Sequence, residues 1–105
     1  MIARIWHGVT EESKGDEFFN YVMETGAKDY RATQGNRGVY VLRRIRDGQA
    51  EFLMISLWES LEAIKKFAGD DNEKAVYYYP RDKEFLLEFE PNVKHYEVLA
   101  SPENQ

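Results

Sequence analysis

The chain has 105 residues, of which 14% are aromatic, and its fourteen basic and nineteen acidic residues give a net charge of −5. This length is typical of one domain, and the aromatic residues supply enough apolar surface for one hydrophobic core. The acidic balance disfavours nucleic acid and anionic membranes as partners, because both attract basic surfaces. The absence of cysteine excludes disulfides, thiolate metal sites and a cysteine nucleophile.

The sequence shows no sign of membrane insertion or export. No apolar run approaches the roughly 20 residues that cross a bilayer. The first residues, MIARIWHGV, contain no apolar core followed by a cleavage site. We therefore expect a cytoplasmic protein with one domain over residues 1–100 and a polar C-terminal tail over residues 101–105.

The first half of the chain predicts a strand, a helix and a hairpin. Residues 1–9 alternate in hydrophobicity like a strand, and apolar residues recur at helical spacing from about residue 14 to residue 32. Gly26 weakens this helix, so we expect a kink or a close contact there. Two strands then follow over residues 39–46 and 49–58, joined by the dipeptide Asp47-Gly48 that is typical of a two-residue hairpin loop.

The second half predicts a capped helix and a last strand. Ser60 is a favourable N-cap for an amphipathic helix that Gly69 ends. Residues 71–78 predict a further short helix, and residues 82–90 fit a helical turn or an edge strand. Residues 93–99 predict the final strand.

The resulting order, β-α-β-β-α-(α)-β, is the ferredoxin-like plan of the α+β class, with helices on one face of an antiparallel sheet. The hairpin register places three pairs on one face: Tyr40/Ile55, Leu42/Leu53 and Arg44/Glu51. Both faces are apolar in the middle, so both must be covered.

We place Ala3, Ile5 and His7 on the helix-covered face, which leaves Trp6, Val41, Phe52 and Met54 uncovered. A second copy of the sheet is the simplest cover, so we expect a homodimer through sheet faces. Arg43, opposite Phe52, is then expected at this interface rather than on an anion inside the barrel.

Four stretches are similar to the antibiotic-biosynthesis monooxygenase superfamily of dimeric α+β barrels. They are MIARIWHG, TGAKDYRATQGNRGVYVLRR, EFLMISLWESLEAIKKFAGDDNEKAVYY and FEPNVKHYEV, and they span nearly the whole chain. The superfamily includes cofactor-free oxygenases, haem-degrading enzymes, isomerase-like proteins and uncharacterised members. The resemblance therefore implies the fold more specifically than the reaction.

The resemblance disfavours haem degradation by the usual residues. Haem-degrading members use an asparagine on the first strand, a tryptophan on the helix after the hairpin and an iron-binding histidine ten residues further on. By spacing from Trp58, these positions hold His7, Phe67 and Tyr77 here, and none of the three matches. We expect no cofactor; were haem to bind, the candidate ligands are Tyr77, His7 and His95.

The candidate catalytic residues are His7 and Tyr77, and the candidate substrate-binding residues are Trp58, Phe67 and Tyr78. Imidazole titrates near neutral pH, and a tyrosine hydroxyl beside a cavity can donate a hydrogen bond. The alternatives are a strand-end histidine bonded to backbone or water, and rings that only pack in the core or the dimer.

The two histidines offer little else. They have no HxH or HxxxH spacing, so we expect no metal site. On the last strand His95 and Glu97 share a face, as an imidazole–carboxylate pair or, in the favoured alternative, as solvated polar groups.

Three functions stay open. The first is a small cofactor-independent monooxygenase acting on an aromatic or polyketide-like molecule, in which the deprotonated substrate itself activates oxygen. The second is a non-catalytic protein that binds a small hydrophobic or haem-like ligand. The third is a structural or regulatory dimer without a ligand.

Overall fold

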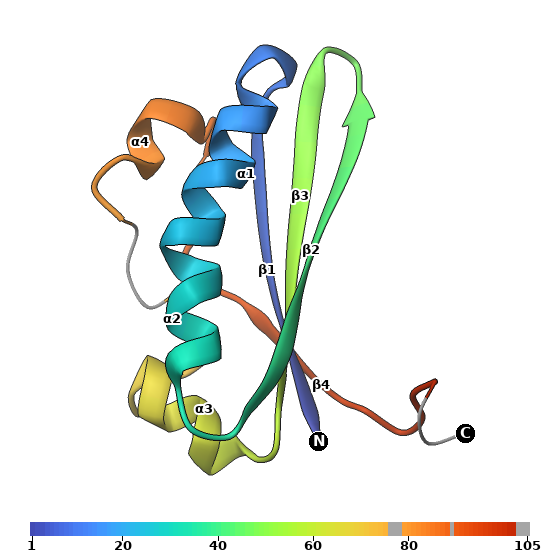
Figure 1. Cartoon of the computed structure of the whole chain (residues 1–105), viewed down its shortest axis with the longest axis vertical. Coiled ribbons are helices and arrows are strands. Elements are labelled where there is room, and N and C mark those ends of the chain that lie inside the picture. The colour runs from blue at the N-terminus through green and yellow to red at the C-terminus, as the bar shows by residue number, and fades with distance from the viewer. Residues whose placement is uncertain (76–78, 89, 103–105) are drawn as a thin grey trace.

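The computed structural model of the protein describes residues 1–75, 79–88 and 90–102. It consists of an antiparallel sheet with all the helices on one side (Figure 1). The elements in chain order are β1 (Ile2–Glu11), the short 3-10 turn η1 (Glu12–Lys14), α1 (Gly15–Glu24), α2 (Gly26–Ala32), β2 (Asn36–Arg46), β3 (Gln49–Trp58), α3 (Leu61–Ala68), α4 (Asp82–Phe85) and β4 (Lys94–Glu97). The predicted ferredoxin-like α+β fold is therefore confirmed.

The strands lie in the order β2-β3-β1-β4, and all neighbours are antiparallel. Asp47 and Gly48 both have positive φ, 54° and 75°, as a tight hairpin turn between twisted strands requires. The predicted register is confirmed, because Arg44 lies opposite Glu51 and its Nη2 is 2.6 Å from a carboxylate oxygen of that residue. The last strand is shorter than predicted and pairs with β1 at the edge of the sheet.

The predicted long helix is interrupted. Thr25, with φ −117° and ψ −94°, separates α1 from α2, so the break falls one residue before the predicted kink at Gly26. The cap of α3 is as predicted, since the Ser60 hydroxyl accepts a hydrogen bond from the Ala63 N–H at 3.2 Å. Gly69 ends that helix with φ 79°.

Two uncertain segments have a clear outcome. Residues 82–85 form α4, so this part of the ambiguous segment is a helical turn. Residues 71–75 contain no helix, contrary to prediction, and the rest of that predicted helix, including Tyr77 and Tyr78, lies outside the described residues.

The helices cover the opposite face of the sheet from the one we predicted. Trp6 lies opposite Met54 on the helix-covered face, whereas His7 lies opposite Leu53 on the other face. Alternation did not distinguish the faces, because both are apolar in the middle. The covered face is the one that carries the large rings of Phe52 and Trp58. On β3 the residues buried under the helices are Ala50, Phe52, Met54, Ser56 and Trp58.

Arg43 also lies on the helix-covered face, and not at an uncovered interface as predicted. Its Nη1 donates to Asp16 Oδ1 of α1 at 2.6 Å. The prediction followed from the inverted assignment of faces, because Arg43 shares a face with Phe52.

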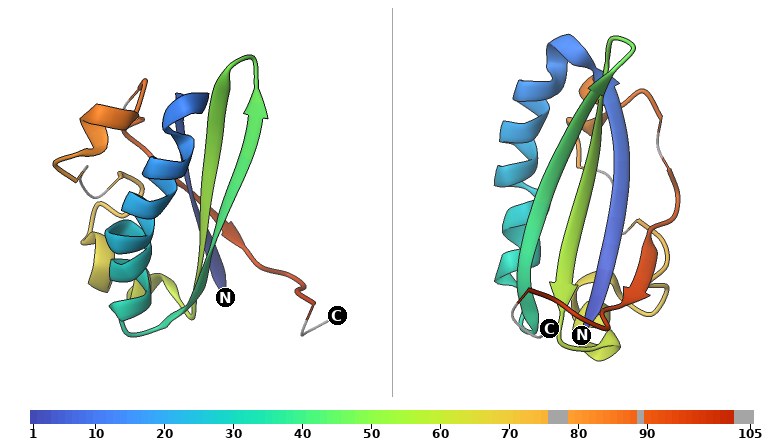
Figure 2. Two further views of the ribbon diagram at one scale, coloured as in Figure 1. Left: turned by 45° about the horizontal axis from the view of Figure 1, so that its top comes forward. Right: turned by 90° about the vertical axis from the view of Figure 1, so that its right-hand side faces the viewer.

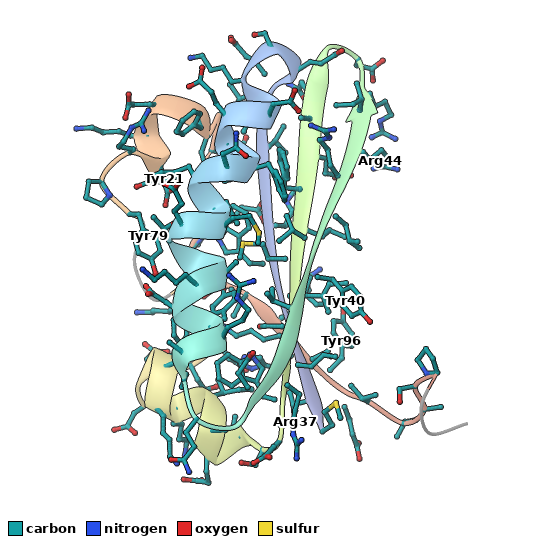
Figure 3. All side chains as sticks on the ribbon, viewed as in Figure 1. Tyr21, Arg37, Tyr40, Arg44, Tyr79 and Tyr96 are labelled. Carbon is teal, nitrogen blue, oxygen red and sulfur yellow. The ribbon has the colours of Figure 1, made fainter. Side chains whose placement is uncertain are left out.

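The other face, called the open face here, is formed by the β1 residues Ala3 to Val9 at odd positions and their neighbours on the other strands. Its large apolar side chains are half-buried or exposed: Ile5, Tyr40, Leu42, Leu53, Ile55, Leu57 and Tyr96. Tyr40, Arg44 and Tyr96 project from the side away from the helices (Figure 3). No helix within the described part of the chain is long and apolar enough to cross a membrane.

Candidate functional site

A small cavity lies between the helices and the helix-covered face of the sheet. Its volume is about 50 Å³, which holds a few water molecules. Strands β1 and β3 contribute Arg4, Trp6 and Met54, and α1, α2 and α3 supply further aromatic and apolar side chains. The segment around α4 closes the outer side with Tyr79 and Asp82.

Aromatic rings form most of the inner wall. Trp6 stacks on Phe18 with ring centroids 6.1 Å apart, and Tyr30 meets Phe67 edge to face at 4.7 Å. Edge-to-face and offset pairs of this kind hold rings in fixed orientations. These four rings, from β1 and the helices α1, α2 and α3, therefore give the cavity an aromatic wall.

Of the predicted substrate-binding residues, Phe67 lines the cavity and Trp58 lies behind it. The Trp58 ring is fully buried, its centroid is 6.0 Å from that of Phe67, and its indole N–H donates to Ser56 Oγ at 2.8 Å. Trp58 thus supports the wall without facing the cavity. The roles predicted for Tyr77 and Tyr78 stay predictions, since both lie outside the described residues.

Arg4 is the most unusual group at the site, because a charged side chain that is only 1% exposed lies on the apolar face of a strand. Its Nη1 donates to the Asn72 carbonyl oxygen at 2.5 Å and its Nη2 to the Lys74 carbonyl oxygen at 3.1 Å. Its Nε is buried without a hydrogen-bond partner among the described residues. Burial lowers the pKa of Arg4, and the nearby Tyr30 opposes this shift.

His95 is held as a neutral acceptor beside Arg4. The Arg4 Nη1 lies 3.0 Å from His95 Nε2, and because a guanidinium only donates, the imidazole nitrogen accepts. Burial, together with the Arg4 charge, lowers the pKa of His95. The strand register explains this partner, since His95 lies directly opposite Arg4 on the helix-covered face.

The outer wall is held by two carboxyl groups. Asp82 Oδ2 accepts the backbone N–H of Tyr79 at 2.7 Å, and the Tyr79 hydroxyl donates to the Asp29 carboxylate on α2. Asp82 is only 6% exposed, and burial raises its pKa while the Tyr79 N–H opposes the shift. A buried carboxyl group with a raised pKa in a cavity is a candidate for a general base.

His7 lies on the open face and does not line this cavity. Its Nε2 is 2.9 Å from Glu51 Oε2, and its Nδ1 bonds the Glu90 carboxylate. Partial burial alone would lower the pKa of His7, but the hydrogen bonds to Glu90 and Glu51 outweigh it and raise the pKa. The catalytic role predicted for His7 stays a prediction, now for a residue on the far side of the sheet.

The sequence reasoning gave no role to Arg4 or Asp82, and it did not include Tyr79 among the candidate site residues. The signal for Arg4 was present, because a charged residue alternates with Ile2 and Trp6 along a strand face that is otherwise apolar. Asp82 and Tyr79 carried no comparable signal, since their place depends on how the segment before α4 folds back. Over residues 1–75, 79–88 and 90–102, no group of three or more histidine, aspartate or glutamate side chains is arranged to hold a metal ion.

The fold is similar to several solved structures. A protein of Nitrosomonas europaea assigned as an antibiotic biosynthesis monooxygenase shares 19% identity and a TM-score of 0.62, over 94% of this chain and 99% of that chain. The haem-degrading protein MhuD of Mycobacterium tuberculosis, solved with two haems in its active site, shares 18% identity and a TM-score of 0.63, over 96% and 98% of the two chains. Rv0793 from the same organism shares 15% identity and a TM-score of 0.60, over 96% and 97%.

At these identities the structural likeness establishes the fold alone. No curated protein matches the chain in sequence. The family model described as antibiotic biosynthesis monooxygenase matches residues 8–77, which is more than half of the chain. The chain therefore belongs to the antibiotic biosynthesis monooxygenase family.

Proposed function

We propose that the protein is a small monooxygenase that oxidises an aromatic or polyketide-like molecule without a metal or an organic cofactor. The observation that carries this proposal is the aromatic cavity lined by Asp82, a buried carboxyl group whose pKa is raised by burial. Membership of a monooxygenase family agrees with it.

The proposed reaction starts with proton transfer. Asp82 accepts a proton from an activated methylene group of the substrate, and the resulting carbanion reduces dioxygen. One oxygen atom then forms the new carbonyl group and the other leaves as water, so that CH₂ plus O₂ becomes C=O plus H₂O. The substrate supplies all four electrons, and the apolar wall keeps bulk water from quenching the carbanion.

The outer wall must move for a ring-sized substrate to enter, because the cavity holds only a few water molecules. Ala75, Tyr79 and Asp82 form this wall, and the hydrogen bond from Tyr79 to Asp29 fastens it to α2. Opening the wall therefore breaks one charge-assisted hydrogen bond.

Haem binding is the competing function, since the structural neighbour MhuD was solved with haems in its active site. The described residues do not fit that group. Both ring nitrogens of His7 are hydrogen-bonded to carboxylates, and His95 Nε2 is bonded to Arg4. The proposed reaction therefore does not use haem.

The test uses purified protein and an anthrone-type substrate in an oxygen electrode. We expect one O₂ consumed per ketone formed, and a loss of at least about 100-fold in rate for Asp82→Asn. Glu84→Gln, on the exposed surface of α4, is the matched control. Turnover that survives Asp82→Asn at the wild-type rate would exclude Asp82 as the base.

Absence of turnover combined with a Soret shift on haemin titration would favour the haem-binding alternative. If the protein shows no turnover and binds no haemin, the result would favour a structural dimer.

We also propose that a second copy of the chain covers the open face. Ile5, Leu53 and Ile55 run across its middle and are only half-buried, because no helix of the described residues covers them. After β4 the chain leaves the sheet on this side (Figure 2), with Leu99 84% exposed. Beside the open face, this segment leaves a hollow of about 880 Å³ that a partner can fill.

Light scattering measures this directly. We expect a dimer at micromolar concentration and a monomer for Leu53→Glu, because a carboxylate buried in a sheet–sheet interface is strongly unfavourable. Leu61→Glu, on the exposed side of α3, should leave the dimer intact. A stable wild-type monomer would refute the proposal.

A further inference from the structure

We propose that Arg4 is an anion-recognition residue, and that the ligand of this cavity is an aromatic molecule with an anionic oxygen, such as a carboxylate, a phenolate or an enolate. This inference rests on the proposed function, because it takes the cavity beside Arg4 as the substrate site. It adds a substrate class, which neither the family nor the cavity shape specifies.

Arg4 is a buried cation without a paired carboxylate among the described residues. A fully buried guanidinium is normally paired with a carboxylate, because an unpaired buried charge is costly. Among the described residues no carboxylate pairs with Arg4. Its neighbours among these residues are neutral: the backbone carbonyls of Asn72 and Lys74, the imidazole of His95, the hydroxyl of Tyr30, and the face of the Phe67 ring 5.9 Å away. No group that holds the Arg4 guanidinium therefore carries a negative charge.

Arg4 also has one N–H group that donates to no acceptor among the described residues. Arg4 lines the cavity, and its Nε–H is buried without an acceptor in the described part of the chain. The two Nη atoms are held by His95 of β4 and by two backbone carbonyls of the segment after α3, which fixes the guanidinium plane while Nε–H stays available. A fixed donor on a positively charged group is what selects an anionic oxygen over a neutral one.

The side chains next to the Arg4 guanidinium, His95 and Tyr30, are neutral. His95 accepts from Arg4 and has a lowered pKa, so it adds no second positive charge that would have to be balanced. Burial raises the pKa of Tyr30, which keeps that hydroxyl protonated next to Arg4. An anionic ligand can supply the hydrogen-bonded negative charge that these two neighbours do not.

The aromatic wall of the cavity indicates that the remainder of the ligand is an aromatic ring. Phe18, Phe67 and Trp6 present ring surfaces to the same cavity. An anionic group at Arg4 with an aromatic ring against these residues would satisfy both the charge and the apolar wall. In the proposed reaction Arg4 would then also stabilise the negative charge that deprotonation places on the substrate oxygen.

The test compares two ligands of nearly the same shape, 2-naphthoate and 2-naphthamide, by titration calorimetry on the wild-type protein. We expect the carboxylate to bind at least about tenfold more tightly, as one charge-assisted hydrogen bond to a buried cation predicts. Arg4→Met should abolish this preference and Arg4→Lys should retain part of it. Arg43→Met is the control, because Arg43 lies on the same sheet face but is paired with Asp16.

The outcomes separate this inference from the proposed function. Equal binding of both ligands would overturn the role of Arg4 and leave the aromatic cavity as the substrate site. Binding of neither ligand would overturn both. If Arg43→Met abolishes the preference for 2-naphthoate, Arg43 and not Arg4 would be the arginine that recognises the anion. Should Arg4→Met fail to fold, the wild-type ratio and the Arg43→Met control still decide the question.

Discussion

Gly26→Ala should make the protein more stable and impair its ligand binding. Gly26 is the first residue of α2 and lines the cavity, and its φ is not positive, so alanine fits its backbone. A Cβ built there would lie 3.4 Å from Met54 Cε and 3.9 Å from Tyr79 Cε2, both ordinary contact distances. The substitution thus adds a methyl group beside the cavity without a clash.

The expected gain in the free energy of unfolding is about 0.5–1 kcal/mol. Most of it comes from the lower conformational entropy of the unfolded chain, and the buried methyl group adds to it. For a domain of this size, this corresponds to a rise in Tm of about 2–8 °C. The same methyl group takes space from a cavity of about 50 Å³, so ligand affinity and turnover should fall.

Scanning calorimetry measures the first effect. Ligand-induced quenching of tryptophan fluorescence measures the second, because Trp6 lines the cavity. Asn20→Ala is the matched control: it raises helix propensity on the exposed side of α1 and should raise Tm without changing binding.

Two results would refute the reasoning. A Gly26→Ala protein with higher Tm and unchanged binding would show that the ligand site is elsewhere. A lower Tm would show that the break between α1 and α2 depends on glycine.

Three further predictions concern the cap, the outer wall and the open face. Ser60→Ala removes the side-chain acceptor at the start of α3 and should cost about 0.5–2 kcal/mol, measured by urea unfolding; no loss would mean that water replaces the cap. Tyr79→Phe removes the hydrogen bond to Asp29, so it should lower Tm and speed ligand entry in stopped-flow fluorescence, whereas Tyr40→Phe on the open face should do neither. The pKa of His7 is raised in the folded state. The ion pairs of His7 therefore stabilise the protein fully at a pH below the pKa of about 6.5 that His7 has in the unfolded chain. This stabilisation is lost as the pH rises through the pKa of His7 in the folded state. The Tm difference between wild type and His7→Gln should therefore be larger at about pH 5.5 than at about pH 8.5, and a constant difference would argue against the ion pairs.

Local signals predicted most of the fold. Asp47-Gly48 has one favoured hairpin geometry, and this geometry set the register that brings Arg44 opposite Glu51. Ser60 and Gly69 are end signals of a helix whose chemistry is contained in the few residues around them. Such features depend on near neighbours in sequence, and this is why they could be predicted.

The site was harder to predict because it depends on which side of the sheet the helices cover. Neighbouring residues of β1 lie on opposite faces, so the choice of covered face decides whether Arg4 and Trp6 or His7 lie under the helices. The two faces are similarly apolar in the middle, so hydrophobicity did not settle this choice. His7 was assigned to the cavity for its chemistry, while Arg4, which does line it, was given no role. The positions of Tyr79 and Asp82 follow from long-range packing against α1 and α2, which no periodicity reports.

A charged residue on the wrong face is nevertheless a readable signal. Arg4 lies between Ile2 and Trp6, where the strand pattern calls for an apolar side chain, and its burial there has a desolvation cost that the neutral partners of its guanidinium only partly offset. His7 breaks the pattern of the open face in the same way, but there two glutamates supply the compensating charge. The difference between these two residues argues for function at Arg4: His7 is paired with carboxylates of the described protein, whereas no carboxylate among the described residues pairs with Arg4, so an anionic ligand can take that place.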